Sequence, residues 1–136
     1  MPAAWILKTE PSTYSYDDLE RDGKTVWDGV KNPLAVKHIG QMQPGDEVLV
    51  YHTGDEKAVV GRAEVVAAPY PDPKLKDPKR LVVEIRAAGR LPQPVTLAQI
   101  KADPVFQDIA LVRMGRLSVV PATAAHRKRL LQLAKV

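Results

Sequence analysis

The segment Trp27-Asp28-Gly29-Val30-Lys31-Asn32-Pro33 places an aromatic ring within six positions of carboxylate and amide side chains. This combination recognises planar heterocycles, because the ring stacks on the ligand's face while the polar groups hydrogen-bond to its edge. Each residue also has a purely structural interpretation, with Trp27 in the core, Asp28-Gly29 in a turn and Asn32 as a helix N-cap. The residues alone favour neither interpretation of Trp27 over the other.

Three further clusters offer polar groups at the ends of expected strands. Lys8-Thr9-Glu10-Pro11 follows the first strand, and on its own it is typical of a surface salt bridge and a turn. Tyr51-His52-Thr53 ends another strand, and alternation puts His52 on the opposite face from Tyr51 and Thr53. We interpret His52 as a hydrogen-bonded structural histidine rather than a general base. Arg116-Leu117-Ser118-Val119 offers a further wall through alternate residues of a last strand.

Patterns typical of enzymes and metal sites are missing from the sequence. The absence of cysteine excludes disulfides, thiolate catalysis and thiolate zinc sites. The three histidines have neither HxH nor HxxxH spacing, so no metal site is expected. There is no GxSxG, Walker or GxGxxG motif. Ser118, His52 and Glu10 together could form a triad, but no local pattern supports one. We therefore expect a protein that is not an enzyme and needs no cofactor.

Short elements must position these clusters. Apolar patterns predict strands over 4–8, 47–53, 58–68, 80–91 and 116–120. Helices are predicted to begin after Ser15, Asn32, Thr96 and Thr123, because these residues match N-cap patterns. Gly61 lies inside a strand and indicates a bulge or a close backbone approach. The proline-rich residues 69–78 are typical of a crossing loop. These elements predict an α+β fold with a mainly antiparallel, barrel-like sheet.

The charge of the chain is unevenly distributed. Its net charge is +4, but residues 1–68 hold 7 basic and 11 acidic side chains, whereas residues 69–136 hold 13 basic and 5 acidic ones. The basic half contains two clusters that could face phosphates, Lys74/Lys76/Lys79/Arg80 and Arg127/Lys128/Arg129, although a solvated loop is favoured for the first. A length of 136 residues predicts a single domain. The chain has no apolar run near the ~20 residues of a membrane span and no secretion signal. We therefore expect a cytoplasmic protein with no membrane partner.

The order of the clusters resembles the EVE domain family of the PUA-like superfamily. The resemblance covers nearly the whole chain, and it rests on seven short motifs that are weak singly and specific in this order. They are Trp5–Pro11, Trp27–Asn32, Pro44–Asp46, Tyr51–Thr53, Val60-Gly61, Tyr70–Asp72 and Arg116–Val119.

This resemblance implies a single EVE domain over residues 1–136, folded as a PUA-like open β-barrel surrounded by short helices. It also implies a non-enzymatic module that takes a modified base of DNA or RNA into an aromatic and polar pocket. The family's pocket maps onto Lys8, Thr9, Glu10, Trp27, Asn32, Tyr51, His52, Thr53, Arg116, Leu117 and Ser118. We expect Trp27 to stack on the base, and Lys8 and Arg116 to contact phosphate.

Two alternatives remain open at this point. A net charge of only +4 is low for a strong nucleic-acid binder, so the pocket could instead sense a free nucleoside-like small molecule. The second is a hydrolase or glycosylase that uses Glu10 or Asp28 as a general base on an extruded nucleotide.

Overall fold

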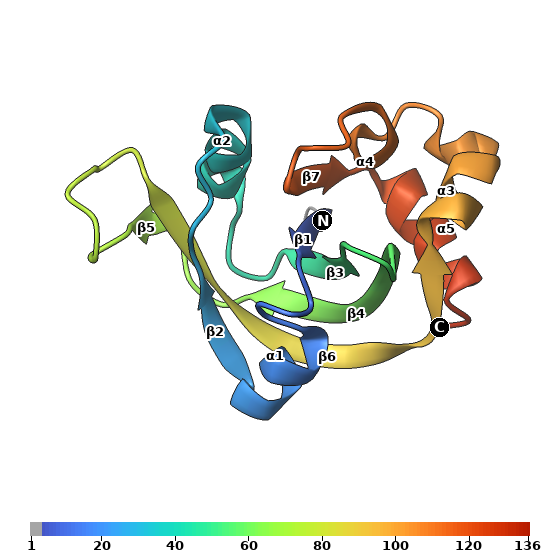
Figure 1. Ribbon diagram of the computed structural model, residues 1–136, viewed down its shortest axis with the longest axis horizontal. Coiled ribbons are helices and arrows are strands. Elements are labelled where there is room, and N and C mark those ends of the chain that lie inside the picture. Colours follow the sequence, from blue (N-terminus) through green and yellow to red (C-terminus); the bar gives the residue numbers. More distant parts are fainter. Residues whose placement is uncertain (1–3) are drawn as a thin grey trace.

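The computed structural model describes residues 4–136, which form one mixed sheet of seven strands with helices around it (Figure 1). The sheet order is β2-β6-β4-β3-β1-β7, with β5 also paired to β6. The strands are β1 (Ala4–Thr9), β2 (Lys24–Trp27), β3 (Glu47–His52), β4 (Ala58–Val65), β5 (Tyr70–Pro71), β6 (Leu81–Thr96) and β7 (Val119–Ala122). The β1–β3 pair is parallel and the other pairs are antiparallel. The sheet curves like a barrel without closing, which confirms the expected fold class.

Local capping signals set where most helices begin. Three of them, α1 (Tyr16–Asp22), α3 (Leu97–Ala102) and α5 (Ala124–Leu133), start with capping boxes at Ser15, Thr96 and Thr123. The Asn32 side chain caps α2 (Pro33–Gln41), which has proline in its first turn. A 3₁₀ turn, η1 (Pro104–Phe106), and the short α4 (Ala110–Arg113) complete the set. None of the described helices is long and apolar enough to cross a membrane.

The core lies between the curved sheet and the helices. In Figure 1, α3, α4 and α5 gather at the end of the sheet where β6 finishes, and α2 stands near β5 and β2 at the other end. Strand β1 lies inside the sheet, between β3 and β7, and its residues Ala4–Leu7 are all buried. Its carboxyl end reaches the surface at Lys8 and Thr9, which are half-buried. The first polar cluster therefore stands on a rigid strand.

Gly61 in β4 has the close contact that its position in a strand predicted. The pairing of β4 with β6 shifts register between Val59 and Gly61. A Cβ atom on Gly61 would lie only 2.3 Å from Cε2 of Tyr16, whose side chain is fully buried. The Tyr16 hydroxyl donates to the Arg62 carbonyl at 2.6 Å and accepts from the Gly89 amide at 3.1 Å. Because Gly61 has no side chain, the Tyr16 ring can pack against β4 there and connect α1 to the sheet.

Several predicted boundaries were wrong. Strand β7 begins at Val119 instead of Arg116, so residues 116–118 form a loop and do not present alternate side chains. Strand β6 continues to Thr96 instead of ending at Leu91, because β4 pairs with it again at Val95 after an irregular stretch. That stretch tolerates Pro92 and Pro94, which cannot donate ladder hydrogen bonds. Strands β2 and β5 and helix α4 were not predicted, since each is too short for a clear periodic pattern.

Candidate functional site

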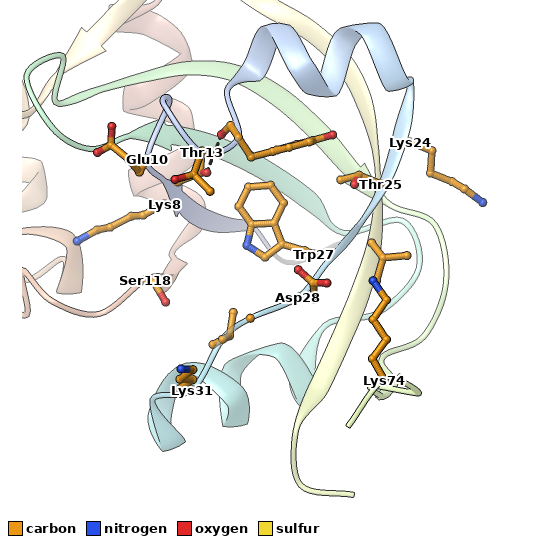
Figure 2. A pocket seen from close by; sticks show the side chains of 15 residues that line it. Lys8, Glu10, Thr13, Lys24, Thr25, Trp27, Asp28, Lys31, Lys74 and Ser118 are labelled. Carbon is orange, nitrogen blue, oxygen red and sulfur yellow. Dashed lines mark hydrogen bonds between the residues drawn. The ribbon is translucent and has the colours of Figure 1, made fainter. Parts of the chain in front are cut away.

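A pocket of about 840 Å³ lies beside the carboxyl end of β1. Its walls come from four parts of the chain: the end of β1 with the turn after it, strand β2 with the loop that follows, the 72–80 loop and the loop before β7. The lining residues are Lys8, Thr9, Glu10, Thr13, Tyr14, Lys24, Thr25, Val26, Trp27, Asp28, Gly29, Val30, Lys31, Lys74 and Ser118. Figure 2 shows the Trp27 indole in the middle of this group.

Trp27 serves both as core residue and as pocket wall. It is the last residue of β2, where it pairs with Val83 of β6, and only 9% of it is exposed. The Tyr14 ring packs against it edge-on, with centroids 6.2 Å apart and planes at 87°. The Trp27 side chain lines the pocket, and its indole Nε1–H donates to no residue within the described range 4–136. An indole fixed in this way offers an aromatic surface and one free hydrogen-bond donor.

The loop after Trp27 carries exposed charged groups along the pocket. Asp28 and Lys31 are exposed, and neither forms an ion pair with another described residue. Gly29 has φ of +77°, in the left-handed region that glycine tolerates, so the chain turns sharply there. Figure 2 places the Asp28 carboxylate next to the Trp27 indole. A carboxylate beside an aromatic wall can accept hydrogen bonds from the edge of a planar ligand.

Thr9 and Glu10 organise the turn after β1. The Thr9 hydroxyl donates to the Tyr14 carbonyl at 2.7 Å, which fixes the turn that carries Tyr14. The Glu10 carboxylate accepts from the Ser12 amide at 3.3 Å, the Ser12 hydroxyl at 3.1 Å and the Thr53 hydroxyl at 3.1 Å. These hydrogen bonds, from Ser12 first and then Thr53, lower the pKa of Glu10 from its usual value. Glu10 therefore stays ionised at neutral pH and is held in place by its own neighbours.

Lys8 lines this pocket, but its ammonium group points elsewhere. Its Nζ donates to the Gly115 carbonyl at 2.9 Å and lies 5.8 Å from the centroid of the Tyr51 ring. Burial lowers the pKa of Lys8. Figure 2 shows the side chain running away from Trp27. The cation thus stands at the boundary between this pocket and a second one.

The structure places the Tyr51-His52-Thr53 cluster outside the Trp27 pocket. Tyr51 and Thr53 line a separate cavity of about 230 Å³, together with Lys8. His52 lines neither cavity: its Nε2 accepts from the Tyr16 amide at 2.9 Å, and its Nδ1 lies 2.6 Å from a Glu56 carboxylate oxygen. Because Nε2 is the acceptor, Nδ1 carries the proton. His52 therefore ties α1 to β3.

The remaining site residues expected from the sequence are spread over different environments. Ser118 lines the Trp27 pocket, whereas Leu117 is only 3% exposed and belongs to the core. Arg116 is exposed and lines neither cavity. The Asn32 side chain accepts from the amides of Leu34 and Ala35 at 2.9 and 3.1 Å, so its oxygen caps α2.

Several lining residues were not expected as site residues. Thr13, Tyr14, Lys24, Thr25 and Val26 come from the turn after β1 and from β2, a strand whose weak pattern gave no signal. Lys74 belongs to the basic loop cluster for which a solvated surface was favoured, yet it lines the pocket. In the other basic cluster, Arg127 pairs with Glu47 and Arg129 with Asp103. Within residues 4–136, no group of three or more His, Asp or Glu side chains is arranged to hold a metal ion.

Comparisons with known proteins place the chain in a family. Its sequence matches the EVE domain over residues 3–133. The NMR structure of Rpa0253 from Rhodopseudomonas palustris is 39% identical, covers 98% of this chain and 93% of its own, and superimposes with a TM-score of 0.93. Human thymocyte nuclear protein 1 is 26% identical over 88% of this chain and 68% of its own length. Human THYN1, solved in complex with 5-methylcytosine containing DNA, shares the fold at 24% identity, 98% coverage of each chain and a TM-score of 0.90. The chain belongs to the EVE domain family.

Proposed function

We propose that this protein binds DNA that carries a modified base, and that it takes the base out of the stack into the Trp27 pocket. The observation that carries the proposal is the Trp27 indole: held by the core, it lines a large pocket with its Nε1–H unused by residues 4–136. The volume of about 840 Å³ is within the range of small-molecule sites and is ample for one nucleotide. The human relative in complex with 5-methylcytosine containing DNA supports this ligand class.

The lining supplies the contacts that an extruded base needs. A base that leaves the helix loses stacking, and an aromatic wall returns about 1–3 kcal/mol per base. The Asp28 carboxylate can accept from the exocyclic amine of a cytosine, while the Trp27 Nε1–H and the Ser118 hydroxyl can donate to its ring nitrogen and carbonyl. A single methyl group contributes only about 0.8 kcal/mol when buried. Preference for a methylated base therefore depends on close fit around the methyl group as well as on stacking.

Binding without catalysis fits the state of the Glu10 carboxylate better than hydrolysis with Glu10 as the general base. A general base works best when its pKa lies near the operating pH. The hydrogen bonds from Ser12 and Thr53 move the pKa of Glu10 in the opposite direction and occupy its oxygens. Glu10 is thus a positioning group for the turn after β1, and we assign it no proton transfer.

The test compares duplexes with and without 5-methylcytosine, at fixed salt, for the wild type, Trp27→Ala and Trp27→Phe. Trp27→Ala is expected to weaken binding of the methylated duplex about 5- to 150-fold, the equivalent of 1–3 kcal/mol, and to abolish the preference for it. Trp27→Phe keeps a stacking surface without the indole donor, so part of the preference survives. Thermal melting of each variant verifies that it is folded.

The same assay separates the competing ligands. A matched RNA with 5-methylcytosine tests whether the partner is RNA instead of DNA. Free 5-methyl-2′-deoxycytidine tests the small-molecule alternative, because a ligand of the native state raises the melting temperature. A wild type that binds the two duplexes equally, or a methylation preference that Trp27→Ala leaves unchanged, contradicts the proposal.

A further inference from the structure

We infer that the second cavity is an anion site, and that it holds a phosphate group of the nucleic acid whose base enters the Trp27 pocket. The inference rests on the proposed function for the identity of the ligand. The cavity has a volume of about 230 Å³ and lies between the end of β3, the 54–57 hairpin, α3 and α4. Its lining residues are Lys8, Tyr51, Thr53, Gly54, Lys57, Leu97, Lys101, Leu111, Val112 and Gly115.

The charged groups that line this cavity all have the same sign. Lys8, Lys57 and Lys101 line it, and no Asp or Glu does. None of the three lysines forms an ion pair with a residue of the described range 4–136. Glu10 lies at the edge of the cavity, where its carboxylate accepts from the Thr53 hydroxyl at 3.1 Å. Three cations against one hydrogen-bonded carboxylate leave an excess of positive charge that an anion would balance.

Lys8 is the strongest evidence for an anion. Burial lowers its pKa, and no neighbouring carboxylate acts to raise it. A half-buried ammonium group that donates only to the Gly115 carbonyl retains two N–H donors. A phosphate oxygen would accept from these donors and offset the cost of desolvation.

Tyr51 adds a donor that the described part of the chain does not use. Only 4% of Tyr51 is exposed, yet its hydroxyl makes no hydrogen bond with any residue from 4 to 136. The hydroxyl oxygen itself is not fully buried, so it can donate to a ligand in the cavity. A phosphate in the cavity would accept this hydrogen bond. The apolar side of the cavity, from Leu97, Leu111 and Val112, limits its size to a small group.

The position of Lys8 links the two cavities. Lys8 lines both cavities. In addition, the hydrogen bond between Thr53 and Glu10 connects the end of β3, at the second cavity, with the turn after β1, at the Trp27 pocket. Strand β1 pairs in parallel with β3, so that Lys8 and Tyr51 lie opposite each other at the same edge of the sheet. A phosphate beside an extruded base would therefore meet the second cavity. Contacts to phosphate position a nucleic acid without reading its sequence.

Two variants and one matched control test the inference. Lys57→Gln/Lys101→Gln removes two charges from the cavity, and Tyr51→Phe removes only the hydroxyl. Lys37→Gln/Lys135→Gln removes the same charge from exposed positions outside both cavities. Each protein is titrated with methylated and unmethylated duplexes over a range of salt concentrations. For the cavity variants we expect equal weakening for both duplexes, an unchanged methylation preference, and, for the lysine pair, a salt slope reduced by about 1 relative to the control.

A titration with inorganic phosphate, followed by NMR at the backbone amides of Tyr51, Gly54 and Lys57, tests the site without DNA. Saturable shifts in the wild type that disappear in both cavity variants support an anion site. If the wild type binds neither duplex, the proposed function fails and this titration alone decides the inference. Two results would overturn the inference. One is that the cavity variants bind DNA as well as the control does. The other is that the wild type binds neither duplex and its amide signals do not shift with phosphate.

Discussion

Replacing Gly61 with alanine should destabilise the protein through one identifiable contact. The new Cβ would lie 2.3, 2.4 and 2.6 Å from three ring atoms of Tyr16, and the Tyr16 side chain has no exposed surface through which to escape. Overpacking of this kind costs about 1–3 kcal/mol. Displacement of the ring also weakens the hydrogen bonds of its hydroxyl to Arg62 and Gly89, each worth about 1 kcal/mol.

The sum is a loss of about 3 kcal/mol in the free energy of unfolding. For a chain of this length, it corresponds to a fall of about 10 °C in melting temperature. Chemical denaturation and calorimetry measure the two quantities. The matched control is Gly115→Ala: a Cβ there meets no described atom within 4 Å, and its φ is outside the left-handed region. This control should change stability by less than about 0.5 kcal/mol.

A double-mutant cycle with Tyr16→Ala shows whether the Tyr16 ring is the cause. Tyr16→Ala is itself destabilising, but it removes all three clashing atoms. Adding Gly61→Ala in that background should cost less than about 1 kcal/mol, so that the coupling energy is about 2 kcal/mol or more. A cost of Gly61→Ala that is the same with and without the ring would refute the reasoning, because it would trace the effect to the backbone of β4.

The remaining predictions concern a cap and an ion pair. Asn32→Ala should lower stability by about 1 kcal/mol through loss of the α2 cap, whereas Asn32→Asp retains the cap; denaturation curves of the two variants measure the difference. The hydrogen bonds from Arg129 first, and then from the Val105 amide, lower the pKa of Asp103 in the folded protein. Its contribution to stability is therefore complete above the unfolded pKa of about 3.9 and is lost as the pH falls through the folded pKa. Asp103→Asn should be less stable than the wild type at pH 7, with a gap that narrows below about pH 4 in denaturation at several pH values; a constant gap would exclude this linkage.

Local signals in the sequence predicted much of the fold. The caps at Ser15, Thr96 and Thr123 act within three residues, so their patterns are sufficient to locate the helix starts. Gly61 was also informative, because a glycine inside an apolar strand often marks a bulge or a close approach of another group to the backbone. Strand β2 gave no clear pattern, since only its last residue, Trp27, is buried. The extent of β6 depends on its renewed pairing with β4, which is a property of the tertiary structure.

The parts of the candidate site that come from short sequence motifs could be predicted. Trp27 and Asp28 are adjacent in sequence and line one pocket, and Lys8, Thr9, Glu10 and Ser118 join them there. Tyr51 and Thr53 lie at the same edge of the sheet but border a second cavity. No spacing in the sequence encodes that division, because it results from the direction of the Lys8 side chain and from the packing of α3 against β6 and of α4 against β7.

The most direct test of the base-binding pocket is an NMR measurement on the complex with a duplex that contains one 5-methylcytosine. If the base is extruded into the pocket, nuclear Overhauser effects should connect its C5-methyl protons with the indole protons of Trp27, and its pairing and stacking contacts within the duplex should be lost. A methylcytosine that keeps its partner and its stacking while the protein is bound, or methyl contacts only to residues outside the Trp27 pocket, would contradict the account.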